Sequence, residues 1–393
     1  MSWFIPYPQL DNEQLEFLEN SENNRGKNYW LKGYAGSGKS VLLIHLLLKK
    51  KEYNPDSRVI IVLYTYALID MIRSGIPEEH KDTAIVTYHQ FYRMTGTWDL
   101  VLVDEVQDLP EYIVRDIHSK SKRVIVAGDT NQSIFDDVCE TNKISEILNG
   151  DSFTLGIIHR ISRSIRKIAQ FFCYDKNGFN AAFMGKIVNL PPRLVKAQDK
   201  DEELKWLILN VKEYARNHYA PAILIPQHFQ IFHFFQQLLE FENKPTLPPE
   251  LDTSNGGDRR NKYRSINAHL RDNGIKFQYL GNGAGSFERA QKEDLVTIMT
   301  YHSAKGLDFK AVFIPFLNSS IEIWGDKERA RTLFFVALTR SREQLFLSYS
   351  GSKHPFLSEV NENDFHKLNA SDEIERMEQP LEGNQDEPPT FVF

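Results

Sequence analysis

The chain has 393 residues, of which 41% are hydrophobic and 25% are charged, a balance typical of a soluble globular protein with two or three domains. No apolar run approaches the roughly 20 residues that span a bilayer, and the N-terminal stretch lacks the basic start and apolar run of a secretory signal. These features exclude the usual membrane-spanning and secreted classes, and we expect a cytoplasmic protein.

The net charge of −6 arises at the C-terminal end of the chain. Residues 371–393 hold seven acidic residues and one basic residue, so residues 1–370 carry equal numbers of the two kinds. The chain is therefore not basic overall, and any surface that binds nucleic acid has to be local. The two cysteines, Cys139 and Cys173, lack metal-ligand spacing, and we expect buried free thiols.

The first chemical signature is GYAGSGKS at residues 33–40, which fits the pattern G-x-x-x-x-G-K-[ST]. It lies between NYWLKG, which predicts a strand, and SVLLIHLLLKKK, which predicts a buried helix. In such a loop the backbone N–H groups surround phosphates, Lys39 reaches the outer phosphates and Ser40 holds Mg²⁺. We expect a nucleotide to bind at Gly33, Tyr34, Ala35, Gly36, Ser37, Gly38, Lys39 and Ser40.

Continuous β-branched runs alternate with helical stretches along the rest of the chain. Such runs predict parallel strands in sheets that are covered on both faces, and therefore an α/β fold. An amphipathic helix is expected over residues 203–215, ELKWLILNVKEYA. The predicted strands are 58–64, 99–105, 122–129, 221–227, 294–301 and 310–316.

A break near residues 177–185 divides these elements into two groups. We expect an N-terminal nucleotide-binding domain over residues 1–183 and a second α/β domain over residues 184–360. The stretch 243–264 is rich in proline, glycine and charge and predicts an exposed loop or insertion. The acidic segment 361–393 predicts a disordered tail.

An acid pair follows the buried run LVLV at the end of a predicted strand. Asp104 would complete the Mg²⁺ shell begun by Ser40, and Glu105 would orient or deprotonate the attacking water. The presence of a second acid favours hydrolysis of the nucleotide over binding alone.

Six segments occur in a fixed order: GYAGSGKS, LVLVDEVQDL, VAGDTNQSIF, IIHRISRSI, VTIMTYHSAKGLDF and LFFVALTRSREQL. In this order they resemble the motor of superfamily 1 helicases of the UvrD, Rep and PcrA type, and the resemblance covers most of residues 10–350. It implies two tandem RecA-like domains with ATP and Mg²⁺ in the cleft between them. It also implies that single-stranded nucleic acid crosses the same cleft and favours DNA over RNA, without deciding between them.

The resemblance gives two arginines a role in catalysis. Arg160 and Arg340 match the family's arginines and would stabilise the negative charge that spreads over the γ-phosphoryl oxygens. Arg163, Arg166 and Arg342 lie near them in the sequence, so the assignment has alternatives.

Four further residues match the family's nucleotide contacts. Gln14 would read adenine, and Gln132 would sense the γ-phosphate and couple it to the nucleic-acid site. Gly306 would lie near the nucleotide. Asp308 stands where the family usually has glutamate against the ribose, and this shorter side chain predicts weaker sugar contacts.

The resemblance also implies a nucleic-acid path, on which aromatic faces would stack against bases. Its matching positions are Tyr64, Thr65, Thr87, Tyr88, His89, Phe135, Thr300 and His302.

The sequence departs from the family pattern in two ways. Asp137 and Val138 stand where an aromatic residue and an arginine usually grip a base, so an acid would repel the phosphates of the strand. His89 and Asp104 are too close in sequence to enclose the family's large accessory insertion, and a second insertion is missing as well. We therefore expect a compact motor.

The predicted activity is a nucleic-acid-stimulated ATPase that moves along single-stranded DNA, 3′ to 5′ by resemblance. One alternative is an ATPase switch subunit of a DNA-repair or phage-defence complex, which would bind a partner such as a nuclease through the acidic tail. A P-loop kinase of small molecules is a third reading, but it explains neither Gln132 nor the two arginine segments.

Overall fold

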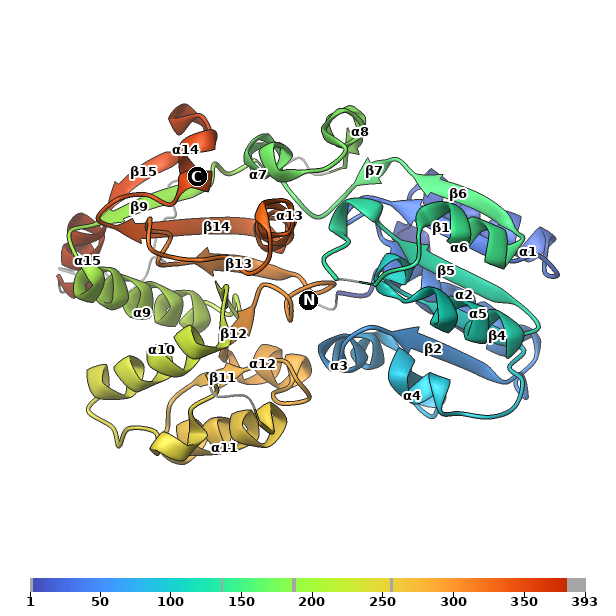
Figure 1. Ribbon diagram of the computed structural model, residues 1–393, viewed down its shortest axis with the longest axis horizontal. Helices are drawn as coiled ribbons and strands as arrows, with labels where there is room; N and C mark the ends of the chain where they lie inside the picture. Colours follow the sequence, from blue (N-terminus) through green and yellow to red (C-terminus); the bar gives the residue numbers. More distant parts are fainter. Residues whose placement is uncertain (1–2, 136, 186–188, 255–256, 380–393) are drawn as a thin grey trace.

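The computed structural model describes residues 3–135, 137–185, 189–254 and 257–379. Two parallel sheets lie side by side, each with helices on both faces, and the chain passes from one to the other through the segment 157–184 (Figure 1). This is the mixed α/β architecture that the β-branched runs predicted.

The first sheet has six strands in the order β3-β2-β4-β5-β1-β6, and all of its neighbours pair in parallel. Its strands are β1 (Tyr29–Gly33), β2 (Val59–Leu63), β3 (Ala84–Thr87), β4 (Leu100–Val103), β5 (Val124–Gly128) and β6 (Asp151–Leu155). Its helices are α1 (Asn12–Asn23), α2 (Lys39–Tyr53), α3 (Tyr66–Gly75), α4 (Tyr88–Tyr92), α5 (Glu111–Ser119) and α6 (Thr141–Leu148).

Alternation along each strand divides the core of this sheet into two layers. Ile61 of β2 joins one buried cluster with Leu42 of α2, whereas Ile60 and Val62 join the opposite cluster with Val114 of α5. The sheet is therefore buried on both faces, which explains why its strands read as continuous apolar runs rather than as alternating ones.

The second sheet has seven strands in the order β11-β12-β10-β13-β14-β9-β15, again all parallel. Its strands are β9 (Arg193–Ala197), β10 (Ala222–Ile225), β11 (Phe277–Tyr279), β12 (Val296–Thr300), β13 (Phe309–Ile314), β14 (Ser341–Ser350) and β15 (His366–Asn369). Its helices are α9 (Lys200–Arg216), α10 (His228–Phe241), α11 (Arg259–Asp272), α12 (Phe287–Glu293), α13 (Lys327–Leu338), α14 (Pro355–Glu359) and α15 (Ala370–Glu378).

The segment between the sheets contains β7 (Ile157–Ile158), α7 (Arg163–Ala169), α8 (Lys176–Ala181) and β8 (Phe183–Met184). It contacts both halves: the ring of Phe179 meets Tyr34 on one side and Phe335 of α13 on the other, with centroids 5.7 and 5.3 Å apart. A domain boundary at residues 183 and 184 therefore stays a prediction, because the preceding helices pack on both domains.

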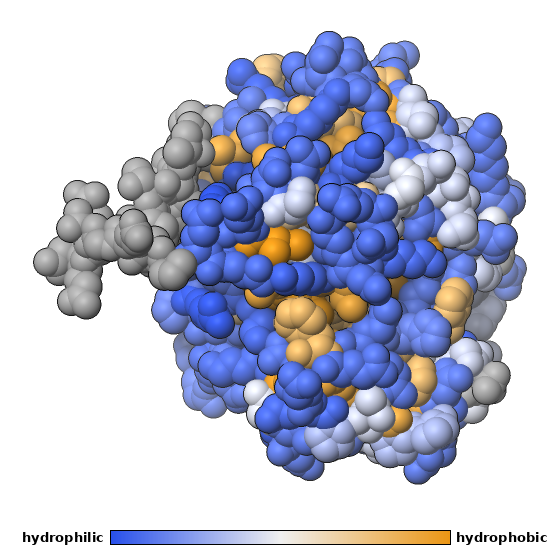
Figure 2. Space-filling model, turned by 90° about the vertical axis from the view of Figure 1, so that its left-hand side faces the viewer, coloured by the Kyte–Doolittle hydropathy of each residue, from blue (hydrophilic) through white to orange (hydrophobic). Residues whose placement is uncertain are grey.

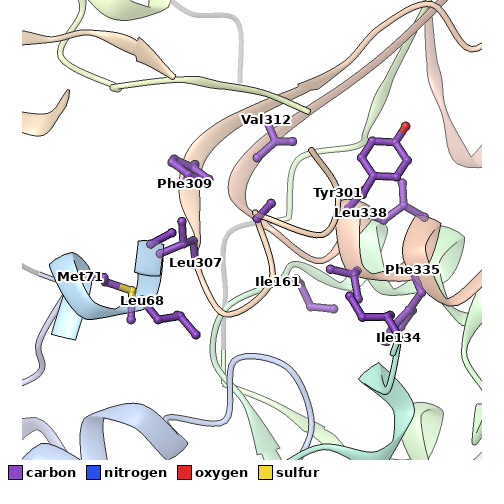
Figure 3. Close-up of a cluster of buried hydrophobic side chains, with 14 of the residues drawn as sticks. Leu68, Met71, Ile134, Ile161, Tyr301, Leu307, Phe309, Val312, Phe335 and Leu338 are labelled. Atoms are coloured by element: carbon purple, nitrogen blue, oxygen red, sulfur yellow. The ribbon is translucent and has the colours of Figure 1, made fainter. Parts of the chain in front are cut away.

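One buried apolar cluster continues from the first domain into the second (Figure 3). Leu68 and Met71 of α3 lie beside Leu307 and Phe309, and Ile134 lies beside Phe335 of α13. A Cβ at Gly306 would come within 2.4 Å of Leu68, so only glycine permits this close approach. The two domains are thus packed together along one edge of the cleft.

The prediction of a disordered tail from residue 361 is wrong for its first part. Residues 366–369 form β15, which pairs with β9, and residues 370–378 form α15. Ala370 and Ile374 are buried against α9, because the acidic segment carries apolar residues at helical spacing. Residues 380–393 lie outside the described part of the chain.

The stretch 243–264 is not simply an exposed loop. Leu247 is buried, and its backbone N–H and carbonyl bond to the side-chain amide of Gln236 on α10. Helix α11 begins at Arg259 with Asp258 as its N-cap. Proline and glycine correctly marked a break between helices, but side-chain bonds from α10 give the described part of the stretch a defined path.

The outer surface of the second domain is mostly hydrophilic, with small scattered hydrophobic spots (Figure 2). Among the described residues, no helix combines the length and apolar character that crossing a membrane requires. Cys139 is buried and Cys173 half-buried, and both thiols are free as expected.

We predict that β15 and α15 stabilise the second domain. The free energy of unfolding of a chain ending at Asp364 should be at least about 3 kcal/mol lower than that of the full chain, because the apolar contacts of Leu368, Ala370 and Ile374 are lost. A chain ending at Gln379 should match the full chain in urea denaturation. Equal unfolding midpoints for all three chains would contradict this role.

Candidate nucleotide and nucleic-acid sites

The glycine-rich loop joins the end of β1 to the start of α2, as its pattern predicted. Gly36 and Gly38 have positive φ angles of 78° and 91°. A Cβ at Gly36 would come within 2.1 Å of the Cβ of Arg160, and one at Gly38 within 2.3 Å of the Gln14 amide. Both glycines are therefore required by conformation and by close approach.

Lys39 and Ser40 occupy the first turn of α2. The Lys39 ammonium donates to the carbonyl oxygens of Gly33 and Tyr34, at 2.7 and 3.0 Å, and so stays over the loop. The Ser40 hydroxyl donates to Oδ2 of Asp104 at 2.5 Å. The loop, its lysine and the first acid of the pair therefore meet at one point.

The two acids follow β4, and both are buried. Glu105 has a positive φ of 55°, a strained conformation for a residue with a side chain, which turns the chain sharply after the strand. Gln107 donates to Oε2 of Glu105 at 2.6 Å and fixes its carboxylate. The pair is thus held by local geometry that a sequence pattern does not display.

The two acids differ only in the direction of their pKa shifts. Burial, together with the neighbouring Glu105, raises the pKa of Asp104 to about 6, so at neutral pH this carboxyl is still mostly ionised. For Glu105 burial acts in the same direction, but the ammonium groups of Lys305 and Lys39 outweigh it and hold its pKa below the usual value. Glu105 is therefore ionised at neutral pH and can accept a proton. Asp104 beside Ser40 forms the oxygen donor set that suits a hard divalent cation.

Gln14 lies against the loop at the start of α1. It belongs to a capping box with Asp11, and its amide donates to the carbonyl of Ser37 at 3.1 Å. Asp11 also contacts the imidazole of His159 at 2.6 Å. The structure therefore brings Gln14 to the loop as predicted, and adds Asp11 and His159, which the sequence did not reveal.

Gln132 and Arg340 meet across the cleft. The guanidinium of Arg340 donates to Oε1 of Gln132 at 2.7 Å, and the Gln132 amide donates to Asp129 at 2.8 Å. Arg340 is 1% exposed and also donates to the carbonyl of Leu307. Burial, with help from Arg160, lowers the pKa of Arg340 to about 9, so the group remains cationic at neutral pH.

Asp308 lies between two arginines. Its carboxylate accepts from Arg160 at 2.9 Å and pairs with Arg342 at 3.2 Å. Although burial opposes it, these guanidinium groups hold the pKa of Asp308 below its usual value. Arg160 therefore lies in the cleft, whereas Arg163 starts α7. Arg342, an alternative from the sequence, reaches the same carboxylate.

A buried ion pair joins the domains beside the acids. Lys305 lies 2.5 Å from Asp108, and their side chains are 2% and 0% exposed. Lys305 also donates to the backbone carbonyl of Gln132. Neither residue was predicted, although each lies inside one of the six sequence segments, because its partner comes from the other domain.

A cavity of about 220 Å³ lies between the domains. Its lining includes residues predicted from the P-loop, the acid pair and both arginines. Trp3, Ile5, Val41 and Met71 add an apolar side that the sequence did not predict.

A row of aromatic rings lies near the cavity and crosses between the domains. Phe135 stacks on Tyr64 with centroids 4.1 Å apart, and Tyr64 approaches Tyr88 at 5.2 Å. On the other side, Phe135 approaches His302 at 6.0 Å, and His302 approaches Trp324 at 5.4 Å. Trp324, which is 49% exposed, was missed by sequence reasoning because it follows an irregular segment without a motif.

The state of His302 follows from its surroundings. Burial and the nearby cations Lys305 and Arg329 lower its pKa to about 4, so the imidazole is neutral at physiological pH. A neutral ring suits stacking and hydrogen bonding rather than ionic contact with phosphate.

The other residues predicted on the nucleic-acid path lie in different environments. The hydroxyl of Thr87 caps α4, and that of Thr300 contacts Ser303 in the turn after β12, so both are used within the fold. Thr65 is half-buried before α3, and His89 is exposed on α4. Their contact with nucleic acid stays a prediction.

Two models of known protein families match the chain, one in each domain. Residues 30–181 match the viral superfamily 1 RNA helicase core domain, and residues 259–352 match the UvrD-like helicase C-terminal domain. The first domain is therefore similar to a superfamily 1 helicase core, and the second domain is similar to the C-terminal domain of UvrD-like helicases. Only residues 93–99 join α4 to β4, so this connection holds no further domain.

Curated relatives match over short stretches. A probable DNA helicase II homolog of Mycoplasma capricolum is 36% identical over 91 residues, which is 21% of this chain and 13% of that protein. The ATP-dependent DNA helicase PcrA of Staphylococcus aureus is 38% identical over 78 residues, 18% of this chain and 11% of that protein. The matches thus span about an eighth or less of the relatives' length.

Solved structures give a weaker likeness. The C-terminal domain of a possible DNA helicase from Lactobacillus plantarum WCFS1 has a TM-score of 0.33 and 16% identity, covering 53% of this chain and 98% of that chain. The PRRSV helicase has a TM-score of 0.42 and 15% identity, covering 85% and 54%.

We predict that the Lys305–Asp108 ion pair stabilises the folded chain and that removing one of its two charges destabilises the chain more than removing both. Burial raises the pKa of Asp108 to about 7, so the pair is fully ionised only above this pH. At pH 8, Asp108→Asn should destabilise the chain by about 3–5 kcal/mol, because the buried Lys305 ammonium loses its nearest carboxylate. The double variant Asp108→Leu with Lys305→Met should recover much of this loss in urea denaturation.

The control is Lys143→Ala, which breaks an exposed pair with Glu146 and should cost at most about 1 kcal/mol. If Asp108→Asn costs no more than this control, the buried pair is not a stabilising link between the domains.

Proposed function

We propose that the chain hydrolyses ATP and uses the cycle to move along single-stranded nucleic acid. The observation that carries this proposal is the contact between Arg340 and Gln132, which joins the domains beside the acid pair. Gln132 lies three residues before Phe135, the centre of the aromatic row. A change at the phosphates would therefore reach the aromatic row through one short segment.

The P-loop residues would hold the phosphates, with Lys39 on the outer ones. Ser40 and Asp104 would hold Mg²⁺, and their oxygens, which lie 2.5 Å apart, are of the kind that this ion prefers. When bound, Mg²⁺ supplies positive charge to the phosphate oxygens.

Glu105 would orient the attacking water and accept its proton, since its carboxylate is ionised and fixed by Gln107. Arg160 and Arg340 would stabilise the charge of the transferring phosphoryl group. Gln14 would contact the adenine and Asp308 the ribose, with Gly306 giving room beside them. In this proposal Arg160 has to exchange part of its contact with Asp308 for phosphate.

The strand would lie along Tyr64, Phe135 and His302, with bases stacked on aromatic faces. Tyr88, predicted on the same path, is buried in the core and would only support the ring of Tyr64. Resemblance to UvrD-type motors favours DNA and 3′ to 5′ movement. The match of residues 30–181 to an RNA helicase core makes RNA the comparison that an experiment has to include. Asp137, which is exposed close to Phe135, would weaken the grip on phosphates by charge repulsion.

A second candidate is an ATPase switch that acts through a protein partner, such as a nuclease of a DNA-repair or phage-defence complex. The exposed Asp137 and the absence of large insertions in the described residues favour it. The acidic residues after Gln379 would be a docking segment in this case. The two candidates differ in whether single strands stimulate ATP turnover.

We predict that single-stranded DNA stimulates steady-state ATP turnover more than single-stranded RNA or duplex does. Lys39→Ala should abolish turnover with and without DNA, because the outer phosphates lose their lysine. Basal turnover that no nucleic acid changes would support the switch candidate instead. Wild-type turnover in Lys39→Ala would remove the P-loop from the mechanism.

We predict that Arg340→Ala lowers turnover about 10³-fold or more while ATP binding changes little, because its charge acts on the transition state. Single-turnover rates and equilibrium binding separate the two effects. The matched control is Arg289→Ala, an exposed arginine paired with Glu293, which should keep wild-type turnover. Equal losses of binding and rate would make Arg340 a ground-state ligand.

A further inference from the structure

An N-terminal strap, residues 3–10, lies across α2 and α3 before the chain enters α1. The indole N–H of Trp3 donates to the carbonyl of Met71 at 2.9 Å and to the hydroxyl of Ser74 at 3.0 Å. A Cβ at Gly75 would come within 2.6 Å of the indole ring, so the ring packs directly on the backbone at the end of α3. Trp3 is therefore anchored and not a free end.

The next residues attach the strap to α2. His45 contacts the carbonyl of Ile5 at 2.9 Å, and the ring of Phe4 lies 4.8 Å from the imidazole. Burial lowers the pKa of His45, so the contact is made by a neutral ring. The strap is thus held at two successive points by the helix that carries Lys39.

Trp3 and Ile5 then line the same cavity as the P-loop. With Val41 and Met71 they form its apolar side, while Gln14 supplies a side-chain amide next to Gly38. An apolar wall beside an amide is the environment that a planar heteroaromatic ring with hydrogen-bonding edges requires. The charged polyphosphate chain would not be stabilised by contact with this apolar surface.

We propose that Trp3 is the binding surface for the base of the nucleotide and that the strap gives this site its preference for base-bearing ligands over bare polyphosphate. The inference rests on the proposed function, because it assumes that ATP binds with its phosphates on the P-loop. It assigns a ligand contact to a segment outside the six motifs.

The test compares two ligands by isothermal titration calorimetry: ATP, and inorganic tripolyphosphate, which has the phosphates but no base. Trp3→Ala should weaken ATP binding about 5- to 150-fold, the range of stacking on one aromatic side chain, and leave tripolyphosphate unchanged. Trp3→Phe should retain most of the ATP affinity. Trp3→Leu, which keeps apolar bulk in the strap, should lose affinity as Trp3→Ala does.

Tyr53→Ala is the matched control, because Tyr53 is an exposed aromatic residue at the far end of α2. Equal weakening of both ligands in Trp3→Ala and Trp3→Leu would overturn the proposal and make the strap a support of the P-loop. Unchanged ATP affinity in both variants would also overturn it. If the wild-type chain binds neither ligand, the proposed function itself fails, and that result is distinct from the other two.

Discussion

The contact between Arg340 and Gln132 is the interaction on which the arrangement of the cleft depends. A guanidinium that is 1% exposed has to be surrounded by acceptors, and here they come from both domains. Because Gln132 is held by Asp129 and its backbone by Lys305, the arginine cannot leave without disturbing that segment. Arg340 interacts electrostatically with Glu105, and Gln132 lies three residues before Phe135 in the aromatic row. In the proposed cycle, this contact would connect charge at the nucleotide with stacking at the rings.

Apolar packing sets the limits within which this contact operates. Leu68 on α3 meets the Gly306 backbone, and one buried cluster continues through both domains. Packed interfaces of this kind have a few discrete arrangements rather than a continuous range. In the proposed cycle, nucleotide exchange would shift the balance between such arrangements. The Lys305–Asp108 pair, buried beside the acids, would favour the arrangement described here.

The sequence predicted most of the fold because its central strands are buried on both faces and read as apolar runs. It missed all four edge strands of the two sheets, β3, β6, β11 and β15, which are three to five residues long, and also the inner strands β9 and β14. It took 361–378 for a tail because acidic residues outnumber the apolar ones that α15 buries. The P-loop and the acid pair were predicted from their own patterns, and the resemblance to superfamily 1 helicases implied the other predicted residues that the cleft brings together. It could not predict Asp108, Lys305 or Trp3, since their partners lie far away in the sequence and only the folded chain brings them close.

The most direct test of the account is the affinity for single-stranded DNA with and without a non-hydrolysable ATP analogue, in the wild-type chain and in Gln132→Ala. Coupling through Gln132 predicts that the analogue changes the Kd of the wild-type chain for DNA by about 5- to 150-fold. By reciprocity, bound DNA should change the Kd for the analogue by the same factor. Gln132→Ala should bind each ligand alone but show little coupling. Equal DNA affinities in the two states of the wild-type chain would contradict the account.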